Sequence, residues 1–271
     1  MEKNTGLVKM KAMIVTGEGI NCDKETALAF TKAGIQAERV HVNDLIANPK
    51  MLEEFHALAF PGGFSFGDDL GAGKAFANKL LHATSNGTRP FDSLVEFIEQ
   101  GKVVIGICNG FQILVKSGLL PALSGKFEQQ VTVFQNDSNR YENRWVKTKF
   151  LDSPCVFSGG ISALEVPCRH GEGKFIAEEK ILRKLWNKKL VVLQYIDSNG
   201  EPTMHFPENP NGAMEAIAGI CNEKGNVFGL MPHPEAFLFE TNHPRWGRER
   251  QEAAGLKLFE NAVNYLKKEF G

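Results

Sequence analysis

The sequence predicts an α/β protein with a mostly parallel, doubly wound sheet and an antiparallel β extension. Over the first half of the chain, apolar strand-like segments alternate with helix-like ones, which is typical of a parallel sheet covered by helices. After Leu123, β segments follow one another over residues 127–168 without intervening helices, and this favours antiparallel pairing. We expect a single domain over residues 11–271 and an N-terminal extension over residues 1–10, because a chain of 271 residues can form one large core.

The first half of the chain supplies the parallel part of the sheet. Its predicted elements are strands over 11–16, 35–42, 57–60 and 102–107, helices over 23–33, 90–100 and 111–116, and a mixed helix and loop segment over 43–55. Asp23 is a suitable N-cap for the first helix, and Gly34 ends it. In such a sheet the functional site lies beyond the carboxyl ends of the strands.

The second half of the chain is richer in strands. The predicted elements are strands over 127–134, 144–150, 163–168, 190–196, 216–221 and 227–231 and a closing amphipathic helix over 248–270. A hairpin turn is expected at residues 223–226. Residues 242–248 contain Trp246 between arginines, which is typical of an interface. Packing of Trp246 under the closing helix is the alternative.

Composition excludes several classes of protein. The net charge of −1 gives no reason to expect nucleic acid or an anionic membrane as a partner. The five cysteines are scattered without a C-x-x-C pair, which argues against a disulfide framework or zinc site and for a reducing compartment. Residues 1–9 lack an apolar signal segment, and no apolar run approaches membrane-spanning length. We therefore expect a cytoplasmic location and no metal.

Cys108 lies where a predicted strand becomes a helix within one residue. A lone cysteine at the end of an apolar strand is usually a small buried hydrophobe. Here Gly106 and Gly110 flank it two positions away on either side, which allows neighbouring chain to approach the bend. This is the nucleophile-elbow pattern with sulfur in place of oxygen. The following helix directs its N-terminus at Cys108, which favours the thiolate, so Cys108 is a candidate nucleophile.

A glycine pair follows the predicted strand over 57–60. Gly62 and Gly63 lie directly after Pro61, and adjacent glycines at a strand end can present backbone N–H groups without side-chain obstruction, as an oxyanion hole requires. Alone, this sequence is an ordinary turn. Together with Cys108 it predicts a donor loop, with the N–H of Asn109 as the second donor.

His233 and Glu235 are the candidate acid–base pair. They follow the strand predicted over 227–231, and Pro232 and Pro234 flank the histidine. Prolines favour extended backbone, in which positions two apart project to the same side. Glu235 is then placed to orient His233 while His233 faces the thiol, the Cys–His–acid relation of nucleophilic catalysis. A histidine alone in a loop is more often a surface residue.

The chain shows no nucleotide-binding motif. The segment over 67–75 resembles a phosphate-binding loop, but the first glycine of that motif would have to be at Asp68, and Ala75 stands where the magnesium-binding hydroxyl is needed. Cys22 likewise replaces the third glycine of a dinucleotide fingerprint. We expect no cofactor in this chain.

Three motifs together resemble the class I glutamine amidotransferases: G-I-C-N-G-F-Q, P-G-G-F-S-F-G-D and P-H-P-E. Further stretches, among them G-I-N-C-D and R-H-G-E-G-K-F, are similar to the glutaminase subunits of phosphoribosylformylglycinamidine synthase. The resemblance covers the chain from about Lys11 to the closing helix. It implies a glutamine amidotransferase fold and a glutaminase that forms a thioester.

The resemblance also implies a role for each site residue. Cys108 would be the nucleophile, His233 the general base and acid, and Glu235 its orienting carboxylate. Gly63 and Asn109 would supply the oxyanion N–H groups, and Gly62, Gln112 and His170 would contribute to binding the substrate L-glutamine.

The expected partner is the synthetase subunit of phosphoribosylformylglycinamidine synthase, with or without a small accessory subunit. The resemblance implies that ATP and Mg²⁺ bind that partner, which would use the ammonia to convert formylglycinamide ribonucleotide. Two alternatives remain at this stage. One is another Cys–His hydrolase, such as a peptidase, although the papain-type C-G-[SA]-C-[WY] motif is absent. The other is a non-catalytic binding module on the same fold.

Overall fold

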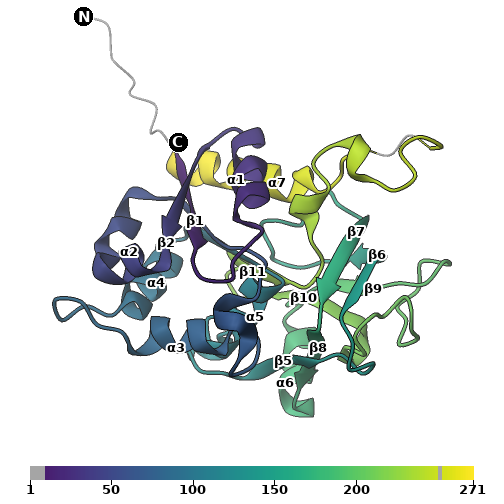
Figure 1. The fold of residues 1–271 in the computed structure, drawn as a ribbon, viewed down its shortest axis with the longest axis horizontal. Coiled ribbons are helices and arrows are strands. Elements are labelled where there is room, and N and C mark those ends of the chain that lie inside the picture. The colour runs from purple at the N-terminus through teal and green to yellow at the C-terminus, as the bar shows by residue number, and fades with distance from the viewer. Residues whose placement is uncertain (1–9, 250–251) are drawn as a thin grey trace, which may run out of the picture.

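The computed structural model describes residues 10–249 and 252–271 and is organised around one mixed sheet (Figure 1). In spatial order, the sheet runs β2-β1-β3-β4-β11-β10-β9-β6-β7. Its strands are β1 (Lys11–Thr16), β2 (Gln36–His41), β3 (Ala57–Phe60), β4 (Val103–Ile107), β6 (Glu142–Phe150), β7 (Ala163–His170), β9 (Val191–Tyr195), β10 (Ile217–Cys221) and β11 (Val227–Leu230). Two further strands, β5 (Val131–Gln135) and β8 (Glu172–Ala177), pair antiparallel in a small separate sheet.

The predicted fold class is confirmed. Strands β2, β1, β3, β4 and β11 pair in parallel, whereas β10, β9, β6 and β7 continue the same sheet with antiparallel pairing. Every residue of β3, β4 and β11 is buried, as expected for central strands covered on both faces. The antiparallel extension is thus part of the main sheet, and only β5 and β8 lie outside it.

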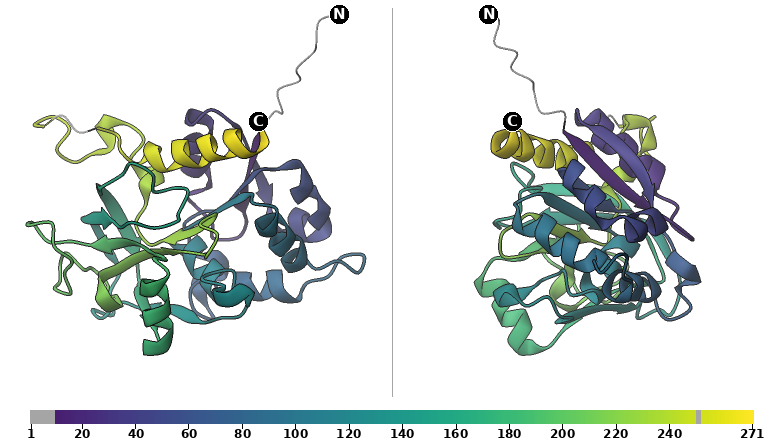
Figure 2. Two further views of the ribbon diagram at one scale, coloured as in Figure 1. Left: turned by 180° about the vertical axis from the view of Figure 1, so that it is seen from behind. Right: turned by 90° about the vertical axis from the view of Figure 1, so that its left-hand side faces the viewer.

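Helices pack around the sheet and against one another. They are α1 (Asp23–Lys32), α2 (Val42–Ala47), α3 (Lys74–His82), α4 (Pro90–Glu99), α5 (Asn109–Lys116), α6 (Glu179–Asn187) and α7 (Leu256–Phe270). Helix α3 packs against α4 and α5, and α7 packs against α1, where the rings of Phe30 and Phe259 lie 5.1 Å apart, edge to face. The yellow helix α7 runs beside α1 in the views of Figures 1 and 2.

Several predicted details were wrong. The N-cap of α1 is Cys22, without a side-chain capping bond, while the Asp23 carboxylate instead pairs with Arg39 at 2.8 Å. Helix α7 begins at Leu256, not at residue 248, and residues 250–251 of the predicted helix lie outside the described residues. Helix α6, which buries Ile181, Leu182 and Leu185, was not predicted.

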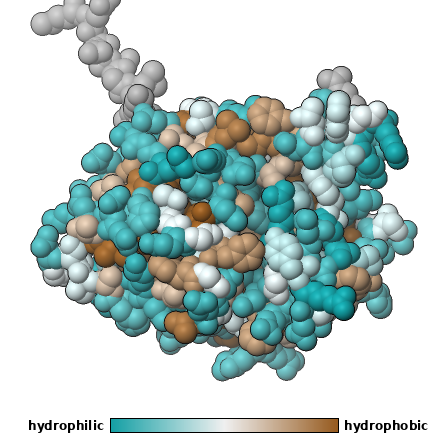
Figure 3. Space-filling model, viewed as in Figure 1, coloured by the Kyte–Doolittle hydropathy of each residue, from teal (hydrophilic) through white to brown (hydrophobic). Residues whose placement is uncertain are grey.

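The surface drawn in Figure 3 is mostly hydrophilic, with small separate groups of apolar side chains. Trp246 is 59% exposed, so the alternative in which it packs under the closing helix is wrong. Its role as an interface residue stays a prediction.

Met10, in the predicted N-terminal extension, is buried, and its carbonyl accepts a hydrogen bond from the Gln36 N–H. The rest of that extension, residues 1–9, lies outside the described residues. Among the helices of the described ranges, none has the length and apolar character to cross a membrane.

Candidate active site

The loops after four neighbouring parallel strands meet at one edge of the sheet. In spatial order β1, β3, β4 and β11 are adjacent, and their carboxyl ends lead to Cys22, Gly62–Gly63, Cys108 and His233 respectively. Since parallel strands present their carboxyl ends on the same side, residues far apart in sequence gather there. The predicted site residues are brought together by this topology.

Cys108 occupies a strained bend between β4 and α5. Its φ is 53° and its ψ is −105°, a backbone conformation that costs a non-glycine residue on the order of 1–3 kcal/mol. The surrounding fold holds it, because the Cys108 N–H donates to the Leu230 carbonyl at 2.8 Å. A Cβ on Gly110 would lie 1.8 Å from the Phe60 carbonyl oxygen, so only glycine allows α5 to approach β3 this closely. The predicted elbow geometry is confirmed.

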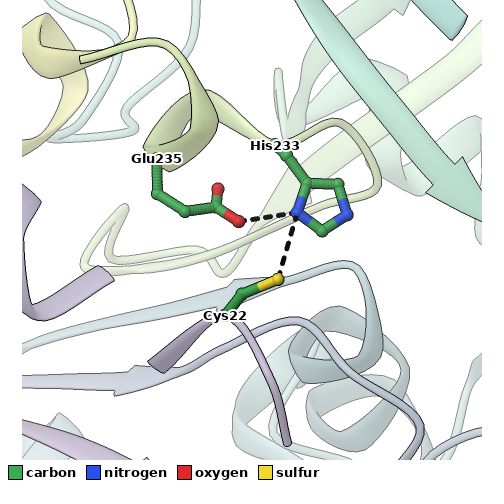
Figure 4. Close-up of side chains that lie close together, drawn as sticks. All are labelled: Cys22, His233 and Glu235. Carbon is green, nitrogen blue, oxygen red and sulfur yellow. Dashed lines mark hydrogen bonds and ion pairs between the residues drawn. The ribbon is translucent and has the colours of Figure 1, made fainter. Parts of the chain in front are cut away.

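His233 and Glu235 form a buried pair, shown in Figure 4. The His233 Nδ1 lies 2.6 Å from the Glu235 Oε1, and both residues are 2% exposed. The expected extended segment was wrong, because Pro234–Ala236 forms a single 3₁₀ turn. The His233 N–H donates to the Pro167 carbonyl at 2.8 Å, which anchors this turn to β7. With Nδ1 committed to Glu235, the remaining nitrogen, Nε2, is available for proton transfer.

The electrostatics of His233 favour the charged imidazole. Burial alone lowers its pKa, but the Glu235 carboxylate and then the charge of Cys108 raise it, and the net pKa lies well above the ordinary value. Nε2 has no hydrogen-bond partner within the part of the chain that the structure describes. Catalytic hydrogen bonds are often long in a free enzyme and shorten when substrate binds. Nε2 is therefore available to form a hydrogen bond with the substrate.

A cavity of about 360 Å³ lies over these groups. The residues lining it are Asn21, Cys22, Glu25, Gly63, Phe64, Cys108, Tyr141, Arg169 and His233. Cys108 and His233 therefore line the same cavity. The Cys108 thiol donates to the Arg169 carbonyl at 3.5 Å, which directs the sulfur toward this wall of the cavity.

The two predicted oxyanion donors lie beside the cavity. Gly63 lines it and packs so closely on the preceding loop that a Cβ would lie 2.5 Å from the Gly19 carbonyl oxygen. Asn109 is the first residue of α5, and a first helical N–H has no acceptor within its own helix. The Asn109 side chain also accepts a hydrogen bond from the Ser65 N–H at 3.3 Å, which links the glycine loop to α5. Their role as oxyanion donors stays a prediction.

The three residues predicted to bind substrate are not among the residues that line the cavity. Gly62 is directly under the imidazole, since a Cβ there would be 2.7 Å from the His233 Cε1. The Gln112 amide is occupied by Asn109 and by the Glu172 carbonyl, at 3.0 and 2.5 Å.

The His170 imidazole is held by Asn136 at 3.1 Å. Burial, and then the charge of His233, lower the pKa of His170 to about 3, so it is neutral. Direct contact of Gly62, Gln112 or His170 with substrate remains a prediction, and the geometry favours a supporting place for each.

Sequence reasoning missed most of the cavity wall. Glu25, Tyr141 and Arg169 line it, and they come from α1, the approach to β6, and β7. Arg169 and Cys22 lie within motifs that carried the family resemblance, which was the available signal. Tyr141 had no such signal, because its position depends on how β6 packs.

Cys22 is a second thiol in the site. Its Sγ lies 4.0 Å from the His233 Nδ1, the nitrogen that already bonds to Glu235. Burial raises the pKa of Cys22, which favours the neutral thiol. Cys22 lies at the N-terminus of α1 but lacks the strained strand-to-helix elbow of Cys108, so Cys108 remains the stronger candidate nucleophile.

The fold is that of a glutamine amidotransferase. The model of the CobB/CobQ-like glutamine amidotransferase domain matches residues 9–266, and the chain belongs to this family.

Its relatives point to one branch of the family. The chain is 44% identical to the phosphoribosylformylglycinamidine synthase subunit PurQ of Methanococcus maripaludis, over 95% of this chain and 98% of that protein. It is also 44% identical to the subunit of the same name from Dehalococcoides mccartyi, over 96% and 98% of the two chains. Among solved structures it is similar to a chain of PurLQS from Thermotoga maritima, with a TM-score of 0.70 and 29% identity over 95% of this chain and 99% of that one.

Proposed function

We propose that this chain is the glutaminase subunit of phosphoribosylformylglycinamidine synthase, an enzyme of purine biosynthesis. It hydrolyses glutamine to glutamate and ammonia and delivers the ammonia to a synthetase subunit. That subunit uses ATP to convert formylglycinamide ribonucleotide to formylglycinamidine ribonucleotide. The full-length similarity to subunits of that name supports the assignment, and the observation that carries the chemistry is the buried His233–Glu235 pair beside the strained Cys108.

The reaction begins at Cys108. The thiolate attacks the carboxamide carbon of glutamine, and the N–H groups of Gly63 and Asn109 stabilise the oxyanion. His233 protonates the leaving ammonia from Nε2, which leaves a thioester on Cys108. The neutral imidazole then takes a proton from water, and the resulting hydroxide hydrolyses the thioester. Glu235 keeps Nδ1 protonated throughout, so Nε2 alone exchanges protons.

The cavity wall suits the charged end of glutamine. Arg169 and Glu25 line it and carry the charges that complement an α-carboxylate and an α-ammonium group. Charge-assisted hydrogen bonds of this kind are stronger than neutral ones. We assign substrate selection to this pair, and Gly62, Gln112 and His170 to support of the groups that act.

The synthetase reaction belongs to the partner. This chain carries no nucleotide-binding motif, so we place ATP and Mg²⁺ on the synthetase subunit. The name of the similar Thermotoga maritima structure, PurLQS, supports assembly with a synthetase subunit and a small accessory subunit. We also propose a cytoplasmic location.

The deciding experiment separates the two half-reactions. In the assembled complex, Cys108→Ala should abolish synthesis from glutamine and leave synthesis from added ammonia intact, because the thiol serves only to release ammonia. Cys155→Ala removes a thiol that is buried elsewhere and is the matched control; it should retain both activities. Loss of both activities in Cys108→Ala, with the complex still assembled, would contradict this division of labour.

The alternative functions predict different results. A peptidase would hydrolyse peptides and ignore free glutamine, and a non-catalytic module would tolerate loss of Cys108. The relatives and the complete Cys–His–Glu arrangement favour the glutaminase.

A further inference from the structure

Three potential metal ligands converge at the floor of the cavity. One ligand atom each from Cys22, His233 and Glu235 lies within 4.8 Å of the other two. Figure 4 shows the three side chains pointing toward one another. The thiol comes from the loop after β1, whereas the other two come from the turn after β11, so the fold alone brings them together. The proposed reaction gives Cys22 no task.

We propose that Cys22, His233 and Glu235 form a binding site for a thiophilic divalent cation of the Zn²⁺ class, and that the bound ion holds the glutaminase in an inactive state. The binding site stands on geometry alone, whereas the inhibition rests on the proposed function.

The ligand types select this class of ion. A thiolate, an imidazole and a carboxylate are the ligands that Zn²⁺ takes in proteins, and a hard ion such as Mg²⁺ prefers oxygen ligands alone. Three protein ligands with a fourth position open to water are common for zinc. The cavity of about 360 Å³ adjoins Cys22 and His233, which leaves room for that water.

The distances are close to those required. Zinc bonds of about 2.3 Å to sulfur and about 2.0–2.1 Å to nitrogen, set at a tetrahedral angle, separate the two ligand atoms by roughly 3.6 Å. The observed separation of the Cys22 Sγ and the His233 Nδ1 is 4.0 Å. The 2.6 Å between Nδ1 and the Glu235 Oε1 must open by several tenths of an ångström. Alternatively, the ion can take the Oε2, which has no hydrogen-bond partner among the described residues.

Binding of the ion and catalysis exclude each other. The ion takes the lone pair of Nδ1, so the proton shared with Glu235 must leave, and the Cys22 thiol loses its proton to become a ligand. The imidazole is then fixed with its proton on Nε2, and metal coordination prevents it from becoming the imidazolium that protonates ammonia.

Cobalt binding provides a test that is independent of activity. Co²⁺ added to the purified full-length chain should produce a sulfur-to-metal charge-transfer band in the near ultraviolet, which Zn²⁺ displaces. Cys22→Ala should lose the band, and Cys108→Ala and Cys155→Ala should keep it. A band that survives in Cys22→Ala but disappears in Cys108→Ala would place the ion on the nucleophile and overturn the proposal, as would the absence of any band in the wild-type chain.

Inhibition supplies the second readout. Zn²⁺ should inhibit glutamine hydrolysis, and a chelator should restore it. Measured against its own uninhibited rate, Cys22→Ala should require at least about tenfold more Zn²⁺ than the wild-type chain for half-inhibition, because loss of even an outer partner of a metal ligand costs about 10–100-fold in affinity. If Cys22→Ala does not fold, Cys22→Ser replaces it, since a hydroxyl keeps the volume but is a poor zinc ligand. Equal sensitivity of wild type and variant would refute the inhibitory role.

Discussion

At the scale of single residues, a short turn sets up the acid–base chemistry. Pro234 separates His233 from Glu235, and the 3₁₀ turn over Pro234–Ala236 directs both side chains inward. The carboxylate stabilises a positive imidazole that burial alone would disfavour. The pair therefore acts as a unit, in which the two members have unequal tasks.

The first prediction concerns this inequality. His233→Ala should lower kcat for glutamine hydrolysis by close to 10⁴-fold, because general acid–base help is worth about 10²–10⁴-fold and His233 acts in both half-reactions. Glu235→Ala should cost less, since Glu235 orients the imidazole and raises its pKa. Steady-state kinetics check the order of the two losses. Equal losses would mean that Glu235 does more than orient.

The same pair has a pH dependence with a definite sign. The Glu235 charge raises the pKa of His233, so Glu235→Gln should lower that pKa, and the imidazolium should be lost at a lower pH than in the wild-type chain. The alkaline limb of the kcat profile should move to lower pH. Nuclear magnetic resonance titration of the His233 ring measures the pKa directly, and an unchanged pKa would contradict this account.

Gly62 gives a prediction based on space alone. A Cβ there would lie 2.7 Å from the His233 Cε1 and 3.2 Å from the Cys22 Sγ, so Gly62→Ala should displace the imidazole. A misplacement of about 1 Å can cost roughly 10²-fold in rate, and we expect a loss of that size in kcat/KM. Gly171→Ala is the matched control, because a Cβ there meets nothing within 4 Å. Full activity of Gly62→Ala would show that the space beside Gly62 does not determine the position of the His233 imidazole.

At the scale of elements, a polar network couples the glycine loop to α5. Asp68 closes the short helical turn η2 (Ser65–Asp68) after the glycines. Its carboxylate lies 3.5 Å from the Asn109 amide nitrogen, and the Ser65 N–H donates to the oxygen of the same side chain. The two elements that would supply the oxyanion donors are therefore held by one amide group.

Within this network, the charged form of the Asp68 carboxylate is disfavoured. Burial and the neighbouring Glu172 carboxylate raise the pKa of Asp68 from 3.8 to about 6. Between these two values the folded chain binds more protons than the unfolded chain, so this group stabilises the fold less as the pH rises from about 4 to above 6.

The fourth prediction follows from that sign. Asp68→Asn should raise the free energy of unfolding at pH 7.5 by on the order of 1 kcal/mol, after discounting for solvent screening, and should give no such gain at pH 4. Denaturant unfolding at the two pH values measures the difference between variant and wild type. Asp69→Asn, at an exposed neighbouring position, should stay within about 0.5 kcal/mol. A gain for Asp68→Asn that is larger at pH 4 would reverse the assigned sign.

At the scale of the whole molecule, the cavity is assembled from both halves of the chain. Gly63 and Cys108 come from the first half of the chain, and Arg169 and His233 come from the second half. A partner that touches either half can therefore change the site. Glycine backbone rotates with little steric penalty, so the loop after β3 is where such a change is easiest.

The fifth prediction is that the isolated chain is a poor glutaminase. Ammonia released without an acceptor is wasted, and loss of one oxyanion donor lowers the rate by about 10²–10³-fold, enough to keep the free chain nearly inactive. Glutamine hydrolysis should rise well beyond threefold when the synthetase subunit, ATP and acceptor are added. A rise within about threefold would contradict activation and leave the triad assignment unaffected.

The sequence by itself determined the features that depend on close neighbours in the chain. The elbow at Cys108 needs only a buried strand, a following helix and two nearby glycines, all within a few residues. The alternation of strands and helices likewise predicted the sheet and the edge at which the site lies. The amphipathic α6 was predictable in the same way, since Ile181 and Leu185 lie one turn apart on its buried face.

Only the tertiary structure decided which distant groups share the cavity. Cys22 and His233 are 211 positions apart in the chain, yet their polar atoms lie 4.0 Å apart, because β1 and β11 end at the same edge of the sheet. Rules of ligand spacing along the sequence cannot detect such a cluster, which is why no metal site was expected. The turn that joins His233 to Glu235 was also settled by packing, since its hydrogen bond to Pro167 comes from another strand. Local sequence therefore determines the nucleophile, whereas the packing of the sheet determines what surrounds it.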